Sequence, residues 1–238
     1  MKPNGFVLYE GPSLLTGEPI VVIAVGFHNK SRNIKTSHMI QTYILCADEN
    51  PIDAVNSGAD TAICGGCMHR KNPLTGLRTC YVRIDTGPNQ VYKTWKKGNY
   101  PVLKDYAIFA NRPVRFGTYG DPAAVPLFVW QNIAAYAGMT TGYTHQWRSN
   151  KFAALASYCQ ASAETAEDVV RANAKGFGTF RVLPVMEEIP ADALHCPASA
   201  EMGKKTTCLD CGACDGASKR NVAIFAHGAS KNRYTGAR

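Results

Sequence analysis

The chain has 238 residues, of which 45% are apolar and 18% charged, and this is enough for one full-sized core or one domain with an appended subdomain. Its formal net charge of +8 favours an anionic partner such as a nucleotide or a nucleic acid. No stretch approaches the roughly 20 apolar residues that cross a bilayer, and the N-terminus lacks the apolar core of a signal peptide. We therefore expect a cytoplasmic protein without a membrane partner, and the sequence leaves its oligomeric state open.

Residues 1–50 predict an N-terminal β segment packed on the core. Two apolar runs, Ile20–Gly26 and Met39–Cys46, are typical of strands. The polar stretch between them, His28–His38, predicts either a hairpin loop or a ligand-binding loop.

Residues 51–190 predict an α/β core in which strands alternate with helices of about a dozen residues. The expected helices are Pro51–Asn56, Asn89–Lys97, Val125–Ala137 and Glu164–Lys175, the last one capped by Ser162. The expected strands of this core are Tyr81–Ile84, Val114–Thr118, Thr140–Thr144, Ala154–Cys159 and Gly178–Leu183, and Asn221–His227, beyond it, is the last strand of the chain. This alternation predicts a largely parallel sheet, folded as a partial or distorted (β/α) barrel with cysteine-rich metal-binding loops. An open doubly wound sheet is the alternative.

Both architectures bind ligands at the C-terminal ends of their strands, where several polar side chains are expected. Arg115, Tyr119 and Asp121 lie along and just after one strand, and His145 follows another. An arginine that points into a barrel needs an anionic partner, and Asp121 is the candidate; a structural ion pair under the turn is the alternative. His145 either contacts a ligand or closes the barrel. Arg181, His227 and the second cysteine loop are expected at the same ends.

The first cysteine group consists of Cys64, Cys67 and Cys80. Its C-x2-C lies on a Gly-Gly turn, which suits a metal knuckle because glycine lets backbone amides face the sulfurs. Three interpretations stay open. They are a structural zinc site with His69 or Cys46 as the fourth ligand, a three-cysteine iron–sulfur cluster with one iron free for substrate or cofactor, and a reduced cysteine pair with a core thiol.

The second cysteine group lies in residues 191–238, which predict a cysteine-cluster loop followed by a last strand. Cys208, Cys211 and Cys214 form a C-x2-C-x2-C, and Cys196, followed by a proline, precedes them. Such spacing is typical of iron–sulfur ligands, with structural zinc as the alternative. Four ligands leave no coordination position for substrate, so we expect a structural or electron-relay centre. Nine cysteines in a reducing compartment favour metal over disulfides.

Basic residues also interleave with aromatic ones around Lys93–Lys97, in a pattern typical of base stacking or of an amphipathic helix. Lys204–Lys205 and the tail from Lys219 are the other dense basic patches. The sequence holds no phosphate-binding loop, no G-x-G-x-x-G, no G-x-S-x-G and no H-E-x-x-H.

Several motifs together resemble a family of small phage-encoded cysteine-rich proteins. They are Cys64-x2-Cys67 with Cys80-Tyr81-Val82, RFGTYGDPAAVP from Arg115 to Pro126, TGYTHQW from Thr141 to Trp147, CPAS at Cys196–Ser199 with the C-x2-C-x2-C, and AHG at Ala226–Gly228. The resemblance covers most of the chain from about residue 40 on, and it implies a location in the host cytoplasm.

A looser resemblance is to radical SAM enzymes, which combine a partial (β/α) barrel, a three-cysteine [4Fe–4S] cluster and often an auxiliary cluster in a C-terminal extension. It implies that Cys64, Cys67 and Cys80 hold a cluster that binds S-adenosylmethionine. It also implies that the second cysteine group holds the auxiliary cluster. The spacing here, C-x2-C-x12-C, departs from the usual C-x3-C-x2-C.

Two functional hypotheses result. The first is a radical-SAM-like iron–sulfur enzyme acting on a nucleotide or nucleic-acid-related substrate, with Arg115, Tyr119, Asp121 and His145 lining the substrate mouth. The second is a non-enzymatic protein in which zinc staples both cysteine groups and a basic face binds nucleic acid or a protein partner.

Overall fold

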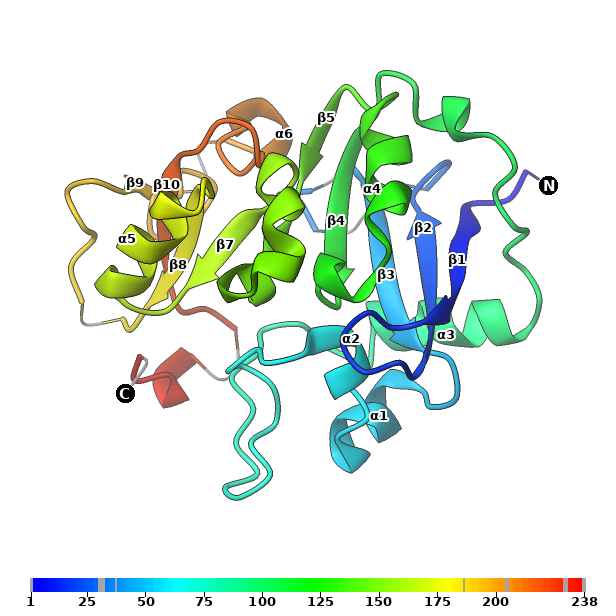
Figure 1. The fold of residues 1–238 in the computed structure, drawn as a ribbon, viewed down its shortest axis with the longest axis horizontal. Coiled ribbons are helices and arrows are strands. Elements are labelled where there is room, and N and C mark those ends of the chain that lie inside the picture. The colour runs from blue at the N-terminus through cyan, green and yellow to red at the C-terminus, as the bar shows by residue number, and fades with distance from the viewer. Residues whose placement is uncertain are drawn as a thin grey trace.

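The strands of the protein form two five-stranded sheets (Figure 1). The computed structural model describes residues 2–29, 33–36, 38–185, 187–203, 206–228 and 231–236. Over these residues the chain is a mixed α/β protein without a closed barrel, and one sheet is entirely parallel. None of its described helices is long and apolar enough to cross a bilayer. Lys204–Lys205 lie outside the described residues.

The first sheet joins the N-terminal β segment to the α/β core. β1 (Gly5–Pro12), β2 (Pro19–Val25) and β3 (Ile40–Cys46) pair antiparallel, and β4 (Pro113–Tyr119) and β5 (Met139–Thr141) then pair in parallel. Because β2 and β3 pair antiparallel, the polar stretch His28–His38 connects the two strands of a hairpin, and its residues 30–32 and 37 lie outside the described part of the chain. The run PIVVIAV of β2 is buried from its second to its sixth residue, as expected for a strand covered on both faces.

The second sheet has the order β6-β7-β8-β10-β9, and all its pairs are parallel. Its strands are β6 (Tyr143–Thr144), β7 (Gln160–Ala163), β8 (Thr179–Leu183), β9 (Leu194–His195) and β10 (Asn221–Phe225). Only Gly142 separates β5 from β6, so one chain segment supplies a strand to each sheet. A Cβ at Gly142 would lie 2.7 Å from Cys159 Sγ, which leaves no room for a side chain there.

Helices connect the parallel strands. They are α1 (Pro51–Ser57), α2 (Thr61–Cys64), α3 (Gly87–Lys96), α4 (Leu127–Ala134), α5 (Ala166–Ala174) and α6 (Cys208–Cys211). Short 3₁₀ segments occupy Tyr106–Phe109, Pro122–Ala124, Gln146–Arg148, Asn150–Ser157 and Lys231–Arg233. Local signals explain α1 well. The Asn50 side chain accepts from two backbone N–H groups at its start, Pro51 begins it, and Gly58 ends it with φ 89°.

Two expected strands and one expected cap are wrong. Tyr81–Ile84 is not a strand, because the Arg78 guanidinium donates to the carbonyls of Cys80 and Val82, at 3.0 Å each, in place of a neighbouring strand. Ala154–Cys159 falls largely in a 3₁₀ segment, and the strand begins one residue later, at Gln160. Ser162 lies within β7, and Thr165 caps α5 by accepting from the Asp168 N–H.

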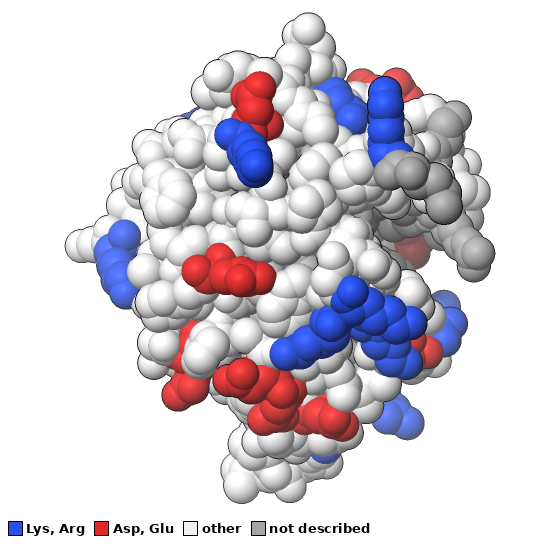
Figure 2. All heavy atoms as spheres, turned by 90° about the vertical axis from the view of Figure 1, so that its right-hand side faces the viewer, with Lys and Arg blue, Asp and Glu red and all other residues white. Residues whose placement is uncertain are grey.

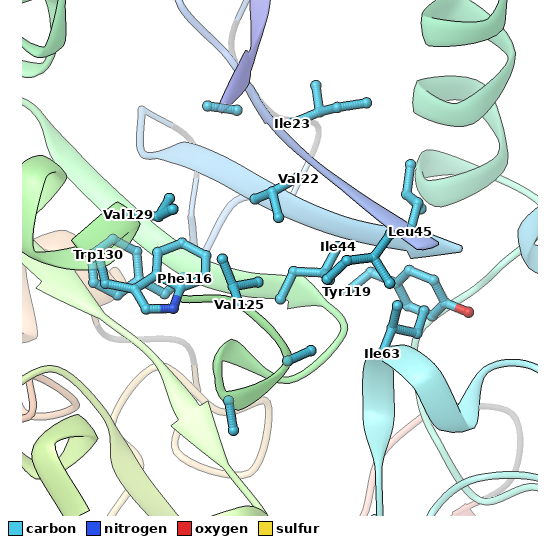
Figure 3. Close-up of a cluster of buried hydrophobic side chains, with 14 of the residues drawn as sticks. Val22, Ile23, Ile44, Leu45, Ile63, Phe116, Tyr119, Val125, Val129 and Trp130 are labelled. Atoms are coloured by element: carbon cyan, nitrogen blue, oxygen red, sulfur yellow. The ribbon is translucent and has the colours of Figure 1, made fainter. Parts of the chain in front are cut away.

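The main hydrophobic core lies between the first sheet and the helices beside it (Figure 3). Val22, Ile44 and Phe116 come from three neighbouring strands, Trp130 from α4 and Ile63 from α2. Because Ile63 immediately precedes Cys64, burial of this side chain fixes the start of the first cysteine group against the sheet.

The basic and aromatic stretch forms the amphipathic helix α3. Tyr92 is buried, Trp95 Nε1 donates to Glu10 at 2.8 Å, and Lys96 Nζ lies 4.6 Å from the Trp95 ring centroid. These aromatic rings pack on the protein, so base stacking is not supported for them. On the face shown in Figure 2, one patch of basic side chains lies beside a row of acidic ones, and other basic side chains lie apart from it.

Candidate functional site

A cavity of about 240 Å³ lies beside the parallel strands. This volume is somewhat below the roughly 300–1,000 Å³ of typical small-molecule sites. Five strands supply one part of its wall: Arg115 and Thr118 from β4, Tyr143 from β6, Ala163 from β7, Phe180 from β8 and Ile224 from β10. Connecting segments supply the rest. They are residues 60–82, the β2–β3 hairpin, the residues that follow β4, β6 and β7, the second cysteine group and the C-terminal tail.

Both cysteine groups contribute to this one cavity. All nine cysteines are free, and six of the seven expected ligands line the wall: Cys64, Cys67, Cys80, Cys196, Cys208 and Cys214. Arg115, Tyr119, Asp121 and His145 line it as well. Cysteines up to 150 positions apart in the chain, from Cys64 to Cys214, thus line a common space.

The first cysteine group lies at the C-terminal ends of β4 and β6. The Asp121 N–H, just after β4, donates to the Ile63 carbonyl at 2.6 Å. The chain turns at Gly65, with φ 54°, where a Cβ would lie 2.6 Å from the Gln146 side chain. Cys80 returns to the group because its N–H donates to the His69 carbonyl at 3.0 Å. Burial, and then the neighbouring thiols, raise the pKa of Cys64, so its thiol stays protonated unless a cation binds.

The imidazole of His145 lies nearest to this group. Its Nε2 is 3.5 Å from Cys67 Sγ and 3.4 Å from Glu164 Oε1. Of the two residues expected as a fourth ligand, His69 lines the cavity with Nδ1 2.9 Å from Thr79 Oγ1. Cys46 is buried elsewhere and donates to the Ala59 carbonyl at 3.4 Å. The sequence placed His145 at the mouth but gave no sign of its contact with Cys67.

Asp121 links the chain segments that follow β4 and β6 at the mouth of the cavity. Its carboxylate accepts from the N–H groups of Ala123 at 2.9 Å and His145 at 2.7 Å. Burial outweighs these hydrogen bonds and raises the pKa of Asp121 to about 6. Burial, and then the charges of His69 and Arg148, lower the pKa of His145 to about 3, so its imidazole is neutral at pH 7. The mouth therefore combines an ionised carboxylate with a neutral imidazole at this pH.

The expected ion pair between Arg115 and Asp121 does not form among the described residues. Arg115 Nη2 donates instead to the Tyr81 hydroxyl at 2.9 Å. Tyr119 is 4% exposed, and its hydroxyl has no hydrogen-bond partner within the described part of the chain. Figure 3 shows this hydroxyl at the edge of the core, beside Ile63. β4 thus presents two polar side chains to the cavity that carry unused hydrogen-bonding capacity.

The second cysteine group lies toward the N-terminal ends of the strands, and the expectation that it lies at their C-terminal ends is wrong. The Cys208 N–H donates to the Lys35 carbonyl, before β3, at 2.8 Å. The side-chain amide of Gln160, the first residue of β7, donates to the Ala213 carbonyl at 3.2 Å. The physical reason is chain order: this loop precedes β10, so it must end where that parallel strand begins.

Local geometry still gathers these four cysteines. Thr207 caps α6, and Gly212 ends it with φ 61°, which turns the chain toward Cys214. Cys196 is held by its N–H, which donates to the Ala223 carbonyl of β10 at 2.9 Å. Burial raises the pKa of Cys214 to about 12, and the charges of the other three thiols act in the same direction.

In neither cysteine group do the described side chains lie close enough together to bind a single metal ion as they stand. Within the ranges that the structure describes, no three Cys, His, Asp or Glu side chains are arranged to hold one metal ion as they stand. A mononuclear zinc site would require these side chains to move closer together, because its ligands all lie about 2.0–2.3 Å from one centre.

Several residues of the wall were not anticipated. Glu164 directly follows β7, as Asp121 follows β4, and its carboxylate accepts from Arg148 at 2.7 Å. Tyr143, Lys35 and Tyr234 also line the cavity. His227 was expected and lies in the wall, whereas Arg181 pairs with Glu187 at 3.6 Å outside it. The position just after a parallel strand is the signal that could have identified Glu164.

Comparison with protein families, with curated proteins and with solved structures finds no match to this chain.

Proposed function

We propose that the protein is a phage iron–sulfur enzyme of radical-SAM-like type, with a [4Fe–4S] cluster at each cysteine group and a nucleotide or nucleic-acid-related substrate between them. The observation that carries the proposal is the single cavity lined by six of the seven expected ligands and by Arg115, Tyr119, Asp121 and His145. The gathering of six half-buried thiols around one space suits a bound cluster, because thiolates are the ligands that such clusters use.

The strand arrangement supports a partial (β/α) barrel for this enzyme. Parallel pairing runs from β3 through β4 to β5, continues in the chain through Gly142 into β6, and then runs through β7 and β8 to β10. Helical segments lie in every connection between these strands except the one from β5 to β6, which is Gly142 alone. In such a partial barrel the cavity would be the barrel interior, and loops instead of further strands would close it.

The two cysteine groups differ in the role they suit. Cys64, Cys67 and Cys80 would hold three irons of a cluster and leave one coordination position, to which S-adenosylmethionine or His145 is the candidate ligand. The second group would complete the coordination of its cluster and leave no iron for substrate. When bound, the first cluster would supply an electron to a ligand in the cavity; the neutral His145 and the ionised Asp121 would orient that ligand and exchange protons with it.

Two features of the wall support a nucleotide-related substrate. Lys35, Arg78, Arg115 and Lys231 line the cavity and make no salt bridge within the described residues. Aromatic rings lie beside them, including Tyr143, whose ring centroid is 4.6 Å from that of Phe180. Cations bind phosphate and aromatic faces stack on bases, so the wall offers surfaces for both parts of a nucleotide.

Anaerobic purification with metal analysis tests this proposal. We expect a brown protein with about eight iron atoms per chain, four for each cluster. Cys67→Ser should remove the first cluster and leave the second, and Cys211→Ser should do the reverse. Cys46→Ser is the matched control, because this thiol lies outside the cavity and a serine there can keep the hydrogen bond to Ala59. A colourless protein with two zinc ions would refute the proposal and favour the zinc-stapled binding protein.

If iron is present, incubation with S-adenosylmethionine and a reductant tests the next step. Cleavage of S-adenosylmethionine that is lost in Cys67→Ser and retained in Cys46→Ser supports the catalytic role of the first group. Cleavage that survives Cys67→Ser contradicts it.

A further inference from the structure

Several positive charges on the cavity wall have no carboxylate partner. Of the carboxylates on this wall, Asp60 forms a salt bridge with Arg70, and Glu164 forms one with Arg148 at 2.7 Å. Asp121, also on the wall, accepts from two backbone N–H groups. Four further cations of the wall form no salt bridge within the described residues: Lys35, Arg78, Arg115 and Lys231. Their charges are left for an anionic ligand.

Tyr81 brings two of these cations to the same place. Arg115, on β4, donates from Nη2 to the Tyr81 hydroxyl at 2.9 Å. The Arg78 guanidinium donates to the carbonyls of Cys80 and Val82, at 3.0 Å each, on either side of Tyr81. Both guanidinium groups are thus joined to one segment of the chain by direct hydrogen bonds. Their partners there are neutral, so both positive charges stay uncompensated.

Aromatic rings hold this pair of groups in position. The guanidinium carbon of Arg115 lies 5.5 Å from the ring centroid of Tyr143. The ring of His227 lies 4.9 Å from that of Tyr81, and a Cβ at Gly228 would lie 3.4 Å from Tyr81 Cβ. The segment that follows β10 therefore packs against Tyr81. Groups that are already held in place lose little conformational entropy when a ligand binds.

Arg115 keeps hydrogen-bond donors for such a ligand. A guanidinium carries five N–H donors, and the bond to Tyr81 is the one side-chain hydrogen bond that Arg115 donates within the described residues. Its side chain is half-buried and lines the cavity, so a ligand there can reach it. Arg78 is half-buried in the same wall.

A phosphate group is the anion that fits these two cations best. A phosphate ester carries about −1.5 to −2 charges at neutral pH and three acceptor oxygens, so it can accept from two guanidinium groups at once. A carboxylate has one charge, and a single guanidinium fork satisfies its two oxygens. The cavity of about 240 Å³ is below the usual range for small-molecule sites, which favours a small ligand over a nucleic-acid strand.

We propose that the side of the cavity formed by Arg78, Tyr81 and Arg115 binds the phosphate group of a small phosphate ester of mononucleotide size, and that Arg115 makes the site selective for the phosphorylated form. This inference rests on the proposed function, because it narrows the nucleotide-related substrate of the same cavity to one class and assigns its phosphate a place. It requires no metal at either cysteine group.

The test is isothermal titration calorimetry of the anaerobically purified full chain with nucleoside monophosphates, with the corresponding nucleosides and with inorganic phosphate. A monophosphate should bind roughly ten- to hundredfold more tightly than its nucleoside, because the phosphate adds charge-assisted hydrogen bonds. Inorganic phosphate should compete with the monophosphate. Arg115→Gln should remove most of the difference and leave the affinity for the nucleoside unchanged. Arg115→Lys keeps the charge but loses the planar fork, so it should remove part of the difference.

Arg171→Gln is the matched control. It removes the same charge from a side chain that is 64% exposed and outside the cavity, so the preference for the monophosphate should stay at its wild-type value. Circular dichroism checks that each variant folds, and if Arg115→Gln does not, Arg115→Lys and the wild-type comparison decide.

Three results overturn the inference: no monophosphate binds the wild type more tightly than its nucleoside, the preference survives in the folded Arg115 variants, or a short single-stranded oligonucleotide binds more tightly than every monophosphate. The proposed function fails separately. Phosphate-dependent binding by a protein that holds no iron refutes the iron–sulfur enzyme and leaves this inference standing, whereas an iron-containing protein without such binding does the reverse.

Discussion

Replacement of Gly216 by alanine tests whether the second cysteine loop is anchored as the structure shows. Gly216 follows the last cysteine of the loop, and a Cβ there would lie 2.4 Å from the backbone N of Cys159 and the backbone C of Tyr158. These atoms precede β7, whose first residue, Gln160, donates its side-chain amide to the backbone carbonyls of Ala213 at 3.2 Å and Arg220 at 3.0 Å. The close approach therefore involves backbone that has little freedom to yield.

The expected magnitude follows from the size of this overlap. Overpacking in a well-packed region costs about 1–3 kcal/mol, and a clash with backbone falls at the upper end of that range. A chain of this length loses about 2–4 °C of melting temperature for each kcal/mol. We therefore expect Gly216→Ala to melt roughly 6–12 °C below the wild type and to lose metal from the second group while the first group keeps its own.

The assay is thermal unfolding followed by circular dichroism, with metal analysis of the folded protein. Gly66→Ala is the control, because a Cβ there meets nothing within 4 Å among the described residues and the backbone φ of Gly66 is outside the left-handed region. The control should melt close to the wild type. Equal melting temperatures for Gly216→Ala and Gly66→Ala would show that the loop does not approach β7 as closely as described.

Two further predictions concern buried carboxylates. The pKa of Asp121 is raised by burial from 3.8 to about 6, so its contribution to stability is fully present below about pH 4 and is lost as the pH rises through about 6. The loss amounts to about 3 kcal/mol, and urea unfolding from pH 4 to 7 should show this dependence in the wild type and not in Asp121→Asn. Arg148→Ala should destabilise the protein by about 1–3 kcal/mol, because it removes the cation that lies 2.7 Å from Glu164 and 2.6 Å from Asp168. Arg171→Ala, which removes only an exposed contact of 3.9 Å, should change the unfolding free energy by less than about 0.5 kcal/mol in the same assay.

Sequence patterns predict the parts of this fold that local interactions determine. Asn50, Pro51 and Gly58 bound α1 because each acts on its nearest backbone neighbours. Apolar runs identify β2 and β3, because a short run of mostly apolar residues is typical of a strand that is covered on both faces. Ala154–Cys159 was misassigned because its composition suits several conformations, and packing around Leu155 and Ala156 decides in favour of a 3₁₀ segment.

Part of the candidate site, the residues just after parallel strands, can also be predicted from local sequence signals. Polar residues after parallel strands gather at one edge, which brings Asp121 and His145 together as expected. The approach of His145 to Cys67 joins residues 78 positions apart, and no local pattern encodes it. The position of Cys208–Cys214 was in fact available from chain order, since a loop that precedes a parallel strand lies at the start of that strand.

The single residue between β5 and β6 has a consequence for fragment complementation. Because Gly142 joins the two sheets within one extended run, a break at this position would separate the chain into halves that each contain one whole sheet but only part of the hydrophobic core, whose buried residues come from both sides of the break. Such halves should aggregate when expressed alone. The loop tip at Leu74, which is 93% exposed, is instead a suitable place for a new chain end or for an inserted tag.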